Sequence, residues 1–232
     1  MATEEMQAVT NLNPAGAAAE RHSGSGQSVA LAIVISGPAG AGKTTLCKNL
    51  LANGGGIFSY AVTTTTRQPR PNEVDGVDYY FIGVEEFQNR QARGDFCEHA
   101  TVHGKNFYGL TNCELKRHFS SGRSVLITMD VQGAMALKEI AASNRDHIIY
   151  GRVVTIFLEP PHPNELIARL LRRGKTNDGE IANRMASMDR EMKSVRLYDY
   201  RIKPGSPADT VKSFIRIVNG EQMKRAANSK FS

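Results

Sequence analysis

ALAIVISGPAGAGKTT, residues 30–45, decides the fold of this chain. Residues 30–35 form an apolar, partly β-branched run, which is typical of a strand buried on both faces of a sheet. Residues 37–44 match the complete pattern G-x-x-x-x-G-K-[ST], and a short helical pattern follows at 46–52. The order of strand, glycine-rich loop and helix start predicts a loop that cradles phosphate groups.

The residue types in this loop suit that chemistry. Glycines allow consecutive backbone N–H groups to converge on phosphate oxygens without a Cβ in the way. The helix N-terminus adds a partial positive charge. The Lys43 ammonium can reach β- and γ-phosphates, and the Thr44 hydroxyl can ligate Mg²⁺. The competing interpretation is a glycine-rich turn that carries a lysine by chance.

Length and charge limit the classes of protein. The chain has 232 residues, enough for one sizeable core, alone or with small inserted subdomains. Its formal net charge of +6 fits an anionic small substrate as well as a nucleic acid. The basic residues are spread along the chain, with the densest cluster at 169–175 and no long Lys/Arg run. We therefore expect no nucleic-acid partner.

Cysteine usage and the chain start indicate the compartment. Cys47, Cys97 and Cys113 are odd in number and widely spaced, which argues against a disulfide framework or a zinc site. No apolar stretch approaches the ~20 residues of a membrane span. The acidic start lacks the hydrophobic segment of a secretory signal. We expect a cytoplasmic protein without a membrane partner, in which residues 1–28 form a disordered tail.

A second informative stretch, YAVTTTTRQPRPNEVDGVDYYF, spans residues 60–81. Its alternation at 61, 63 and 65 predicts a short strand. Arg67 and Arg70 follow, three residues apart, in a segment that two prolines stiffen, so that two guanidinium groups can reach one phosphate. The alternative is that both arginines are solvated surface charges.

Two further apolar runs predict buried strands at 124–129 and 153–158. Asp130 follows the first run, at the carboxyl end of a strand, where α/β folds place ligand chemistry. Asp130 can also be the N-cap of the helix expected at 131–142, and the two roles are compatible. We expect further helices at 164–173, 178–196 and 208–226.

Taken together, these stretches resemble the guanylate kinase family. Residues 60–81 are similar to the family signature S-x-T-T-R-x-P-R-x-x-E-x-x-G-x-x-Y-x-F, and GPAGAGKT is similar to its phosphate loop. The likeness continues in order through residues 94–100, 108–109, 129–134, 156–161, 173–184 and 198–200. It covers about residues 30–222 at the spacing of the family.

The resemblance implies an α/β fold, in which a parallel, doubly wound P-loop core carries two insertions. The guanylate-kinase-like domain is expected to span residues 29–232. One insertion, mostly β and near 61–113, would bind GMP. The other, near 162–190, would form a helical lid that closes over the ATP phosphates.

The resemblance also implies the reaction. Guanylate kinases transfer the γ-phosphoryl group of ATP to GMP, giving ADP and GDP in purine nucleotide metabolism, with Mg²⁺ as cofactor. The acceptor is a phosphate whose second pKa is about 6, so that no general base is required. Positioning two polyanions and neutralising their charge is then the main task. The expected partners are GMP and ATP, with monomer and homodimer both left open.

The family pattern carries site residues to this sequence position by position. The ATP phosphates would contact Gly37, Pro38, Ala39, Gly40, Ala41, Gly42, Lys43, Thr44 and Thr45, and Thr44 would also bind Mg²⁺. The GMP phosphate would contact Arg67, Arg70, Tyr79 and Tyr108, and the guanine would contact Thr63 and Glu98. Asp130 is also expected to bind GMP. Catalysis would depend on Lys43, on Asp130 in the phosphate and Mg²⁺ region, and on the lid arginines Arg173 and Arg184.

Simpler interpretations of several of these residues remain open. A carboxylate at Glu98 suits guanine because N1–H and N2–H₂ form a paired donor edge that adenine lacks, but Glu98 can also be a surface carboxylate. Tyr79 and Tyr108 can be core aromatics with satisfied hydroxyls. The lid arginines can belong to a solvated helix face.

Four positions depart from the family pattern. Thr63 replaces a serine and keeps its hydroxyl. Leu110 stands where a Ser or Thr usually contacts the guanine carbonyl, and Thr111 is the nearest substitute. Thr128 replaces an aspartate, and Pro204 replaces an asparagine near the ATP base. These departures bear on rate and on guanine selectivity more than on the phosphate machinery.

Two other functions compete with the family reaction. A related P-loop kinase would use a different monophosphate acceptor. A non-catalytic guanylate-kinase-like module would serve as an interaction domain, but such modules typically lose the loop lysine and the lid arginines. Lys43, Thr44, Arg173 and Arg184 are all present here.

Overall fold

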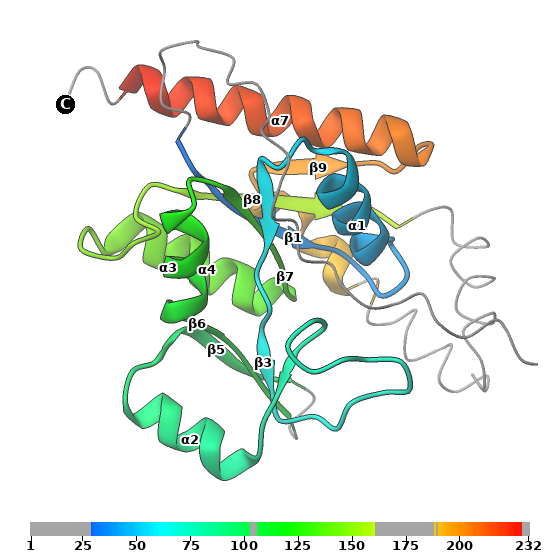
Figure 1. The fold of residues 1–232 in the computed structure, drawn as a ribbon. Coiled ribbons are helices and arrows are strands. Elements are labelled where there is room, and N and C mark those ends of the chain that lie inside the picture. Colours follow the sequence, from blue (N-terminus) through cyan, green and yellow to red (C-terminus); the bar gives the residue numbers. More distant parts are fainter. Residues whose placement is uncertain (1–28, 103–105, 161–187, 189, 229–232) are drawn as a thin grey trace, which may run out of the picture.

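The computed structural model describes residues 29–102, 106–160, 188 and 190–228. The tail expected at 1–28 and the helix expected at 164–173 lie outside these residues. Almost all of the lid expected at 162–190 also lies outside them. The described residues form two sheets, flanked by helices (Figure 1).

A five-stranded sheet forms the core, and every neighbouring pair in it is parallel. In spatial order its strands are β2 (Phe58–Tyr60), β7 (Ser124–Thr128), β1 (Ala32–Ser36), β8 (Val153–Leu158) and β9 (Tyr200–Ile202). The central strand β1 belongs to the apolar run at the start of the deciding stretch, and all of its residues are buried. The predicted parallel α/β core is therefore confirmed.

Helices cover both faces of this sheet (Figure 1). They are α1 (Lys43–Asn53) and α7 (Pro207–Asn228) on one face, and α3 (Asn112–Ser120) and α4 (Val131–Ser143) on the other. Ile33 and Ile35 pack in the cluster that contains α1 and α7 residues, whereas Ala32 and Val34 pack in the cluster with α3 and α4. Successive strand residues point to opposite faces, so β1 contributes to both clusters, as in a doubly wound fold.

A smaller, four-stranded sheet lies apart from the core sheet. Its spatial order is β4 (Tyr80–Phe81), β3 (Thr64–Thr65), β6 (Asn106–Thr111) and β5 (Phe96–Val102), with α2 (Val84–Ala92) packed on it. Phe87 of α2 is fully buried and stacks on Phe96 and Phe107, with ring centroids 4.4 and 5.4 Å apart. These aromatic contacts give the smaller sheet its own apolar layer.

Some expected elements differ in extent from the structure. The strand expected at 61–65 is ordered as a strand only at Thr64–Thr65. The residues before it bridge the two sheets instead: the Ala61 N–H donates to the Leu126 carbonyl, and the Thr63 carbonyl accepts from Tyr80. The helix expected to reach residue 196 ends earlier, because Val195–Leu197 form a 3₁₀ turn. Neither α2 nor α3 was predicted.

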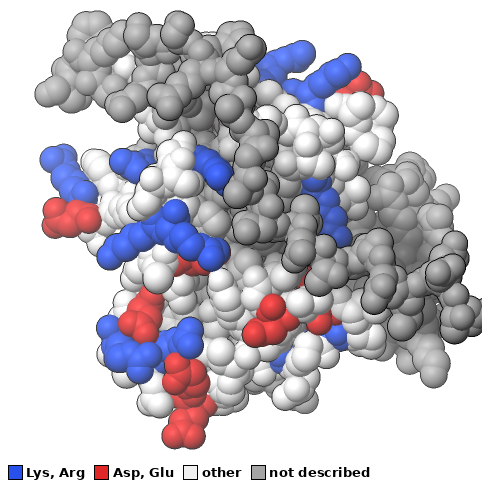
Figure 2. Space-filling model, viewed as in Figure 1, with Lys and Arg blue, Asp and Glu red and all other residues white. Residues whose placement is uncertain are grey.

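Charged side chains and thiols are distributed over the described residues without a single concentration of either (Figure 2). Figure 2 shows Lys and Arg side chains scattered among acidic ones over the described part of this face, without one continuous basic stripe. All three cysteines are free: Cys47 is buried, Cys97 is half-buried and Cys113 is exposed. Among the helices that the structure describes, none combines the length and apolar character needed to cross a bilayer.

Candidate active site

The loop between β1 and α1 has a backbone that glycine adopts readily and other residues do not. Gly37, Gly40 and Gly42 have φ angles of 144°, 88° and 104°. A Cβ on Gly37 would lie 2.2 Å from the carbonyl oxygen of Leu158 in β8, so no other residue fits there. The first turn of α1 contains no acidic residue. Its N–H groups and its partial positive charge are therefore available to an anion.

The Lys43 side chain curls over this loop. Its ammonium donates to the carbonyl oxygen of Gly37 and, at 3.1 Å, to that of Pro38. Lys43 also lines a cavity on one side of the loop. Thr44 and Thr45 follow on the exposed first turn of α1. The end of the loop thus carries one ammonium group, and two exposed hydroxyl-bearing residues follow it.

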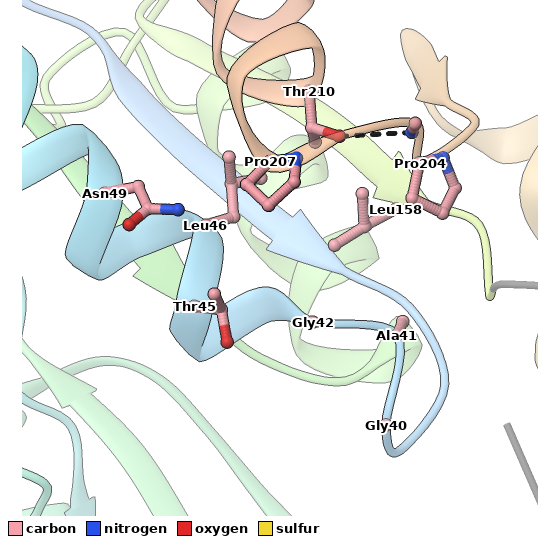
Figure 3. A pocket seen from close by; sticks show the side chains of 11 residues that line it. Gly40, Ala41, Gly42, Thr45, Leu46, Asn49, Leu158, Pro204, Pro207 and Thr210 are labelled. Carbon is pink, nitrogen blue, oxygen red and sulfur yellow. Dashed lines mark hydrogen bonds between the residues drawn. The ribbon is translucent and has the colours of Figure 1, made fainter. Parts of the chain in front are cut away.

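The first cavity, of about 430 Å³, opens beside the loop, between α1, the end of β8 and the start of α7 (Figure 3). Its walls are Gly40, Ala41, Gly42, Thr45, Leu46, Asn49, Leu158, Pro204, Gly205, Pro207 and Thr210. The Gly205 N–H donates to the Thr210 hydroxyl at 3.3 Å, which ties the 204–207 segment to α7. Pro204 therefore presents an apolar wall where the family pattern has an amide.

The second cavity, of about 290 Å³, lies between the phosphate loop and the smaller sheet, and it touches other residues of the loop. Its walls are Gly37, Ala39, Lys43, Thr63, Tyr79, Glu98, Ala100, Tyr108, Gly109, Thr128, Met129, Asp130, Gly133 and Glu191. The two cavities therefore meet at the loop. Two ligands that both carry phosphate could place those phosphates against each other here.

Glu98 is the buried acid of the second cavity. It lies on β5, and 8% of the residue is exposed. Burial, and to a lesser extent the nearby charge of Asp130, raises the pKa of Glu98 to about 7. No cation among the described residues forms an ion pair with Glu98. A buried carboxylate of this kind is suited to accept hydrogen bonds from a ligand that offers paired N–H donors.

Asp130 is the N-cap of α4. Its Oδ1 accepts from the Gly133 N–H at 2.9 Å, and its backbone carbonyl accepts from the Ser36 hydroxyl at 3.4 Å. Asp130 also lines the second cavity, at the carboxyl edge of the core sheet. Asp130 therefore both caps α4 and lines the second cavity.

Arg67 belongs to a network behind the cavity wall. Its guanidinium makes a two-pronged ion pair with Glu73, at 2.8 and 3.0 Å, and its Nε donates to the Tyr108 hydroxyl at 3.1 Å. It also stacks over the Tyr79 ring, 5.2 Å from the centroid. The hydrogen bonds to Glu73 and Tyr108 raise the pKa of Arg67, and the bond from Arg67 lowers the pKa of Glu73.

The network leaves Tyr108 as a hydrogen-bond donor to the cavity. Its hydroxyl oxygen accepts from Arg67, so its own proton remains for another acceptor. Tyr79 lies edge-on to Tyr108, with ring centroids 5.9 Å apart. Burial is the main cause that raises the pKa of Tyr79, which keeps its hydroxyl protonated. Two phenol groups therefore face the space where an anion would sit.

The structure brings together most, but not all, of the residues that the sequence singled out. Thr63, Tyr79, Glu98, Tyr108 and Asp130 share the second cavity with Lys43. Arg67 and Arg70 both contact Glu73: the Arg67 guanidinium is paired with its carboxylate, while Arg70 is exposed and donates its backbone N–H to it at 2.7 Å. Arg173 and Arg184 lie outside the described residues.

Two of the departures from the family pattern have structural explanations. Leu110 is fully buried and packs with Ala61 and Leu115 in the core. Thr111 is not among the residues that line the second cavity, and its Oγ1 caps α3 by accepting from the Glu114 N–H at 3.2 Å. The Thr128 hydroxyl contacts the Tyr60 hydroxyl at 2.6 Å.

Sequence reasoning missed several contributors to the site. Glu73 stands at the acidic position of the 60–81 signature, which was a usable signal for an arginine partner. Gly133 and Glu191 line the second cavity, and Tyr60 supports its wall through Thr128. Gly133 lies in the block 129–134 that matches the family pattern, which was a usable signal. No local pattern points to Glu191 or Tyr60, because they reach the cavity only through the folding of distant segments.

Comparisons with known proteins agree with this geometry. The guanylate kinase family model matches residues 30–221. A guanylate kinase of Clostridium perfringens is 39% identical over 192 residues, 83% of this chain and 84% of that protein. That of Thermotoga maritima is 35% identical over 195 residues, 84% and 89% of the two chains. The crystal structure of guanylate kinase from Anaplasma phagocytophilum has a TM-score of 0.66 and 32% identity, covering 86% of this chain and 89% of that one.

Proposed function

This chain belongs to the guanylate kinase family and is a phosphotransferase, and we propose that it binds GMP and ATP in the two cavities that meet at the phosphate loop. The observation that carries the proposal is the shared loop. Gly37 and Lys43 line the second cavity while Gly40 and Gly42 line the first, so the phosphates of two nucleotides would meet over one glycine-rich backbone.

The second cavity is assigned to GMP. Glu98 offers a buried carboxylate to the N1–H and N2–H₂ edge of guanine, with Thr63 beside it. Tyr79 and Tyr108 direct phenol protons toward the acceptor phosphate, and Arg67 supplies positive charge behind Tyr108. Arg70, which is exposed, is assigned a phosphate contact through the family pattern alone.

The first cavity is assigned to the ATP nucleoside, and the loop to its phosphates. The apolar faces of Leu158, Pro204 and Pro207 suit a purine ring, and Thr45 and Asn49 supply polar contacts nearby. The family pattern extends the phosphate contacts over residues 37–45. Arg173 and Arg184 are proposed, from that pattern alone, to bring further positive charge to the transferred group.

The donor set of the loop fits a Mg²⁺ ion bound together with ATP. Mg²⁺ keeps several waters and needs few protein ligands, so the Thr44 hydroxyl beside the phosphate-binding amides is sufficient. Among the described residues, no cluster of three or more His, Cys, Asp or Glu forms a metal cage of its own. When bound, the ion would neutralise β- and γ-phosphate oxygens, and Asp130 lies in the same region.

The residues of this chain orient the two substrates, and none of them is needed as a general base. An oxygen of the GMP phosphate attacks the γ-phosphorus of ATP, and the bond from that phosphorus to the β-bridging oxygen breaks, giving GDP and ADP. Because the second pKa of the acceptor phosphate is about 6, its oxygens are ionised near neutral pH. Lys43 and the loop amides stabilise the charge that develops on the phosphoryl oxygens.

One assay tests this assignment. Purified protein is given Mg²⁺ and ATP with GMP, IMP, AMP, CMP or UMP in turn, and ADP release is followed. GMP should be the best acceptor, and IMP, which lacks the N2 amine, should lose about tenfold to a hundredfold in kcat/KM because one Glu98 contact is missing. A kcat/KM for AMP equal to that for GMP, or a rate of ADP release that is the same with every acceptor, contradicts the proposal.

A further inference from the structure

Two hydroxyl groups meet at the carboxyl edge of the core sheet, beside the site. Tyr60 ends β2 and Thr128 ends β7, and these strands are parallel neighbours. The Tyr60 Oη and the Thr128 Oγ1 lie 2.6 Å apart. Tyr60 packs against the apolar cluster around α1, so its ring is held from behind.

The position of Thr128 connects this pair to the phosphate loop. Thr128 is the register partner of Ile35 in β1, two residues before Gly37. It lines the second cavity together with Lys43 and Asp130. Its side chain therefore stands where the acceptor cavity meets the loop, at the place assigned to the junction of the two phosphates.

The chemistry of the two hydroxyls sets the direction of their hydrogen bond. A phenol is a much stronger acid than an aliphatic alcohol, and is therefore the better donor. Burial raises the pKa of Tyr60 to about 12, so the phenol keeps its proton at every working pH. With Tyr60 donating, the Thr128 oxygen is the acceptor, and the Thr128 proton remains for a second partner.

We propose that Thr128 donates a hydrogen bond to a phosphoryl oxygen at the junction of the two substrates, and that Tyr60 is the positioning residue that holds Thr128 in this orientation. The proposal rests on the proposed function, which places phosphates there. A carboxylate at position 128 would accept hydrogen bonds, whereas this pair offers a neutral donor to an anion. Tyr60 and Thr128 thus act as one unit.

The test is a double-mutant cycle on the full chain with Thr128→Val, Tyr60→Phe and the double variant. Valine keeps the shape of threonine and phenylalanine keeps the ring, so each change removes a hydroxyl. Thr128→Val should lower kcat by about tenfold or more, with KM for both nucleotides changed much less. Tyr60→Phe should lower kcat in the same direction, and the double variant should match Thr128→Val.

Two further variants separate positioning from simple packing. Thr128→Ser keeps the donor and should restore most of kcat. Tyr150→Phe removes the hydroxyl of an exposed tyrosine that lines neither cavity and should leave kcat unchanged. Thermal unfolding of each variant shows whether the fold is intact.

Several results would overturn the pair without touching the proposed function. The first is a wild-type kcat in Tyr60→Phe. The second is a double variant whose fold-loss of kcat equals the product of the losses in the two single variants. The third is a Thr128→Val variant whose Tm falls while its kcat does not. Wild-type protein without GMP-dependent ADP release would instead overturn the proposed function, and the inference with it.

Discussion

Gly133, in the first turn of α4, lies directly against the carboxylate of Glu98: a Cβ at Gly133 would be 3.2 Å from each of the two carboxylate oxygens. The Gly133 N–H is also the group that Asp130 caps, at 2.9 Å. The start of α4 therefore contacts two of the acids that line the second cavity, Glu98 and Asp130. A side chain at position 133 would displace the acid assigned to the base.

Gly133→Ala should accordingly raise the KM for GMP, by about tenfold, because a shifted carboxylate no longer meets both N–H groups. The KM for ATP should change little, since no residue of α4 lines the first cavity. Steady-state kinetics with each nucleotide varied in turn measures both. Gly220→Ala is the matched control, a helical glycine of α7 with open space around its Cβ. Equal effects of the two substitutions would contradict the contact.

The pH dependence of GMP use should follow Glu98. Its pKa is raised from 4.5 to about 7, so below pH 7 the ionised, hydrogen-bond-accepting form becomes scarce. The KM for GMP should rise as the pH falls from 8 to 6. Glu98→Gln should show a high KM that no longer follows this titration. Titration of the GMP phosphate itself, near pH 6, affects both proteins alike and cancels in the comparison.

The same shift has a consequence for stability. Between about pH 4.5 and 7, Glu98 is largely protonated in the folded protein, whereas the same side chain is already ionised in the unfolded chain. The stabilising contribution of this group is complete below pH 4.5 and is lost as the pH rises through 7. Glu98→Gln should therefore flatten this part of the stability profile in urea unfolding. An unchanged slope would show that another group is responsible.

Arg67→Lys should weaken GMP binding although the charge is kept. Lysine lacks the planar fork that reaches both Glu73 oxygens and the Tyr108 hydroxyl at once. We expect the KM for GMP to rise about tenfold to a hundredfold, with a smaller change for ATP. Arg93→Lys changes an exposed arginine paired with Asp95 at 3.0 Å, and it should be neutral. A neutral Arg67→Lys would mean that charge alone is needed.

Lys43→Ala should abolish turnover while leaving GMP binding nearly intact. The Lys43 ammonium lies over the Gly37 and Pro38 carbonyls, on the donor phosphate loop. Calorimetry with GMP, beside the ADP-release assay, separates the two effects. Near wild-type turnover in the variant would refute the role of Lys43.

Leu110→Thr should destabilise the fold. Leu110 is fully buried among apolar residues, so a threonine there loses packing and buries a hydroxyl. The free energy of unfolding should fall by about 1–3 kcal/mol in urea titration. Leu51→Thr, at a position on α1 that is 41% exposed, serves as the control and should cost less. Equal losses would contradict the core role of Leu110.

The sequence alone determined the elements whose cause is local. A β-branched apolar run followed by G-x-x-x-x-G-K-T predicts a strand, a glycine-rich loop and a helix. The loop needs glycine at positions 37 and 42 because both residues have positive φ angles. Asp130 as N-cap, the parallel core and the family reaction followed in the same way from motifs and their order.

Only the tertiary structure decided how the side chains of distant segments are used. Glu73 pairs with the Arg67 guanidinium, Leu110 packs into the core, and the Thr128 hydroxyl contacts that of Tyr60 on the neighbouring strand. These outcomes depend on which strands become neighbours and on which face each residue then lies. The physical reason is that burial and pairing energies arise only when the two sheets and α4 are assembled, so no window of the sequence contains them.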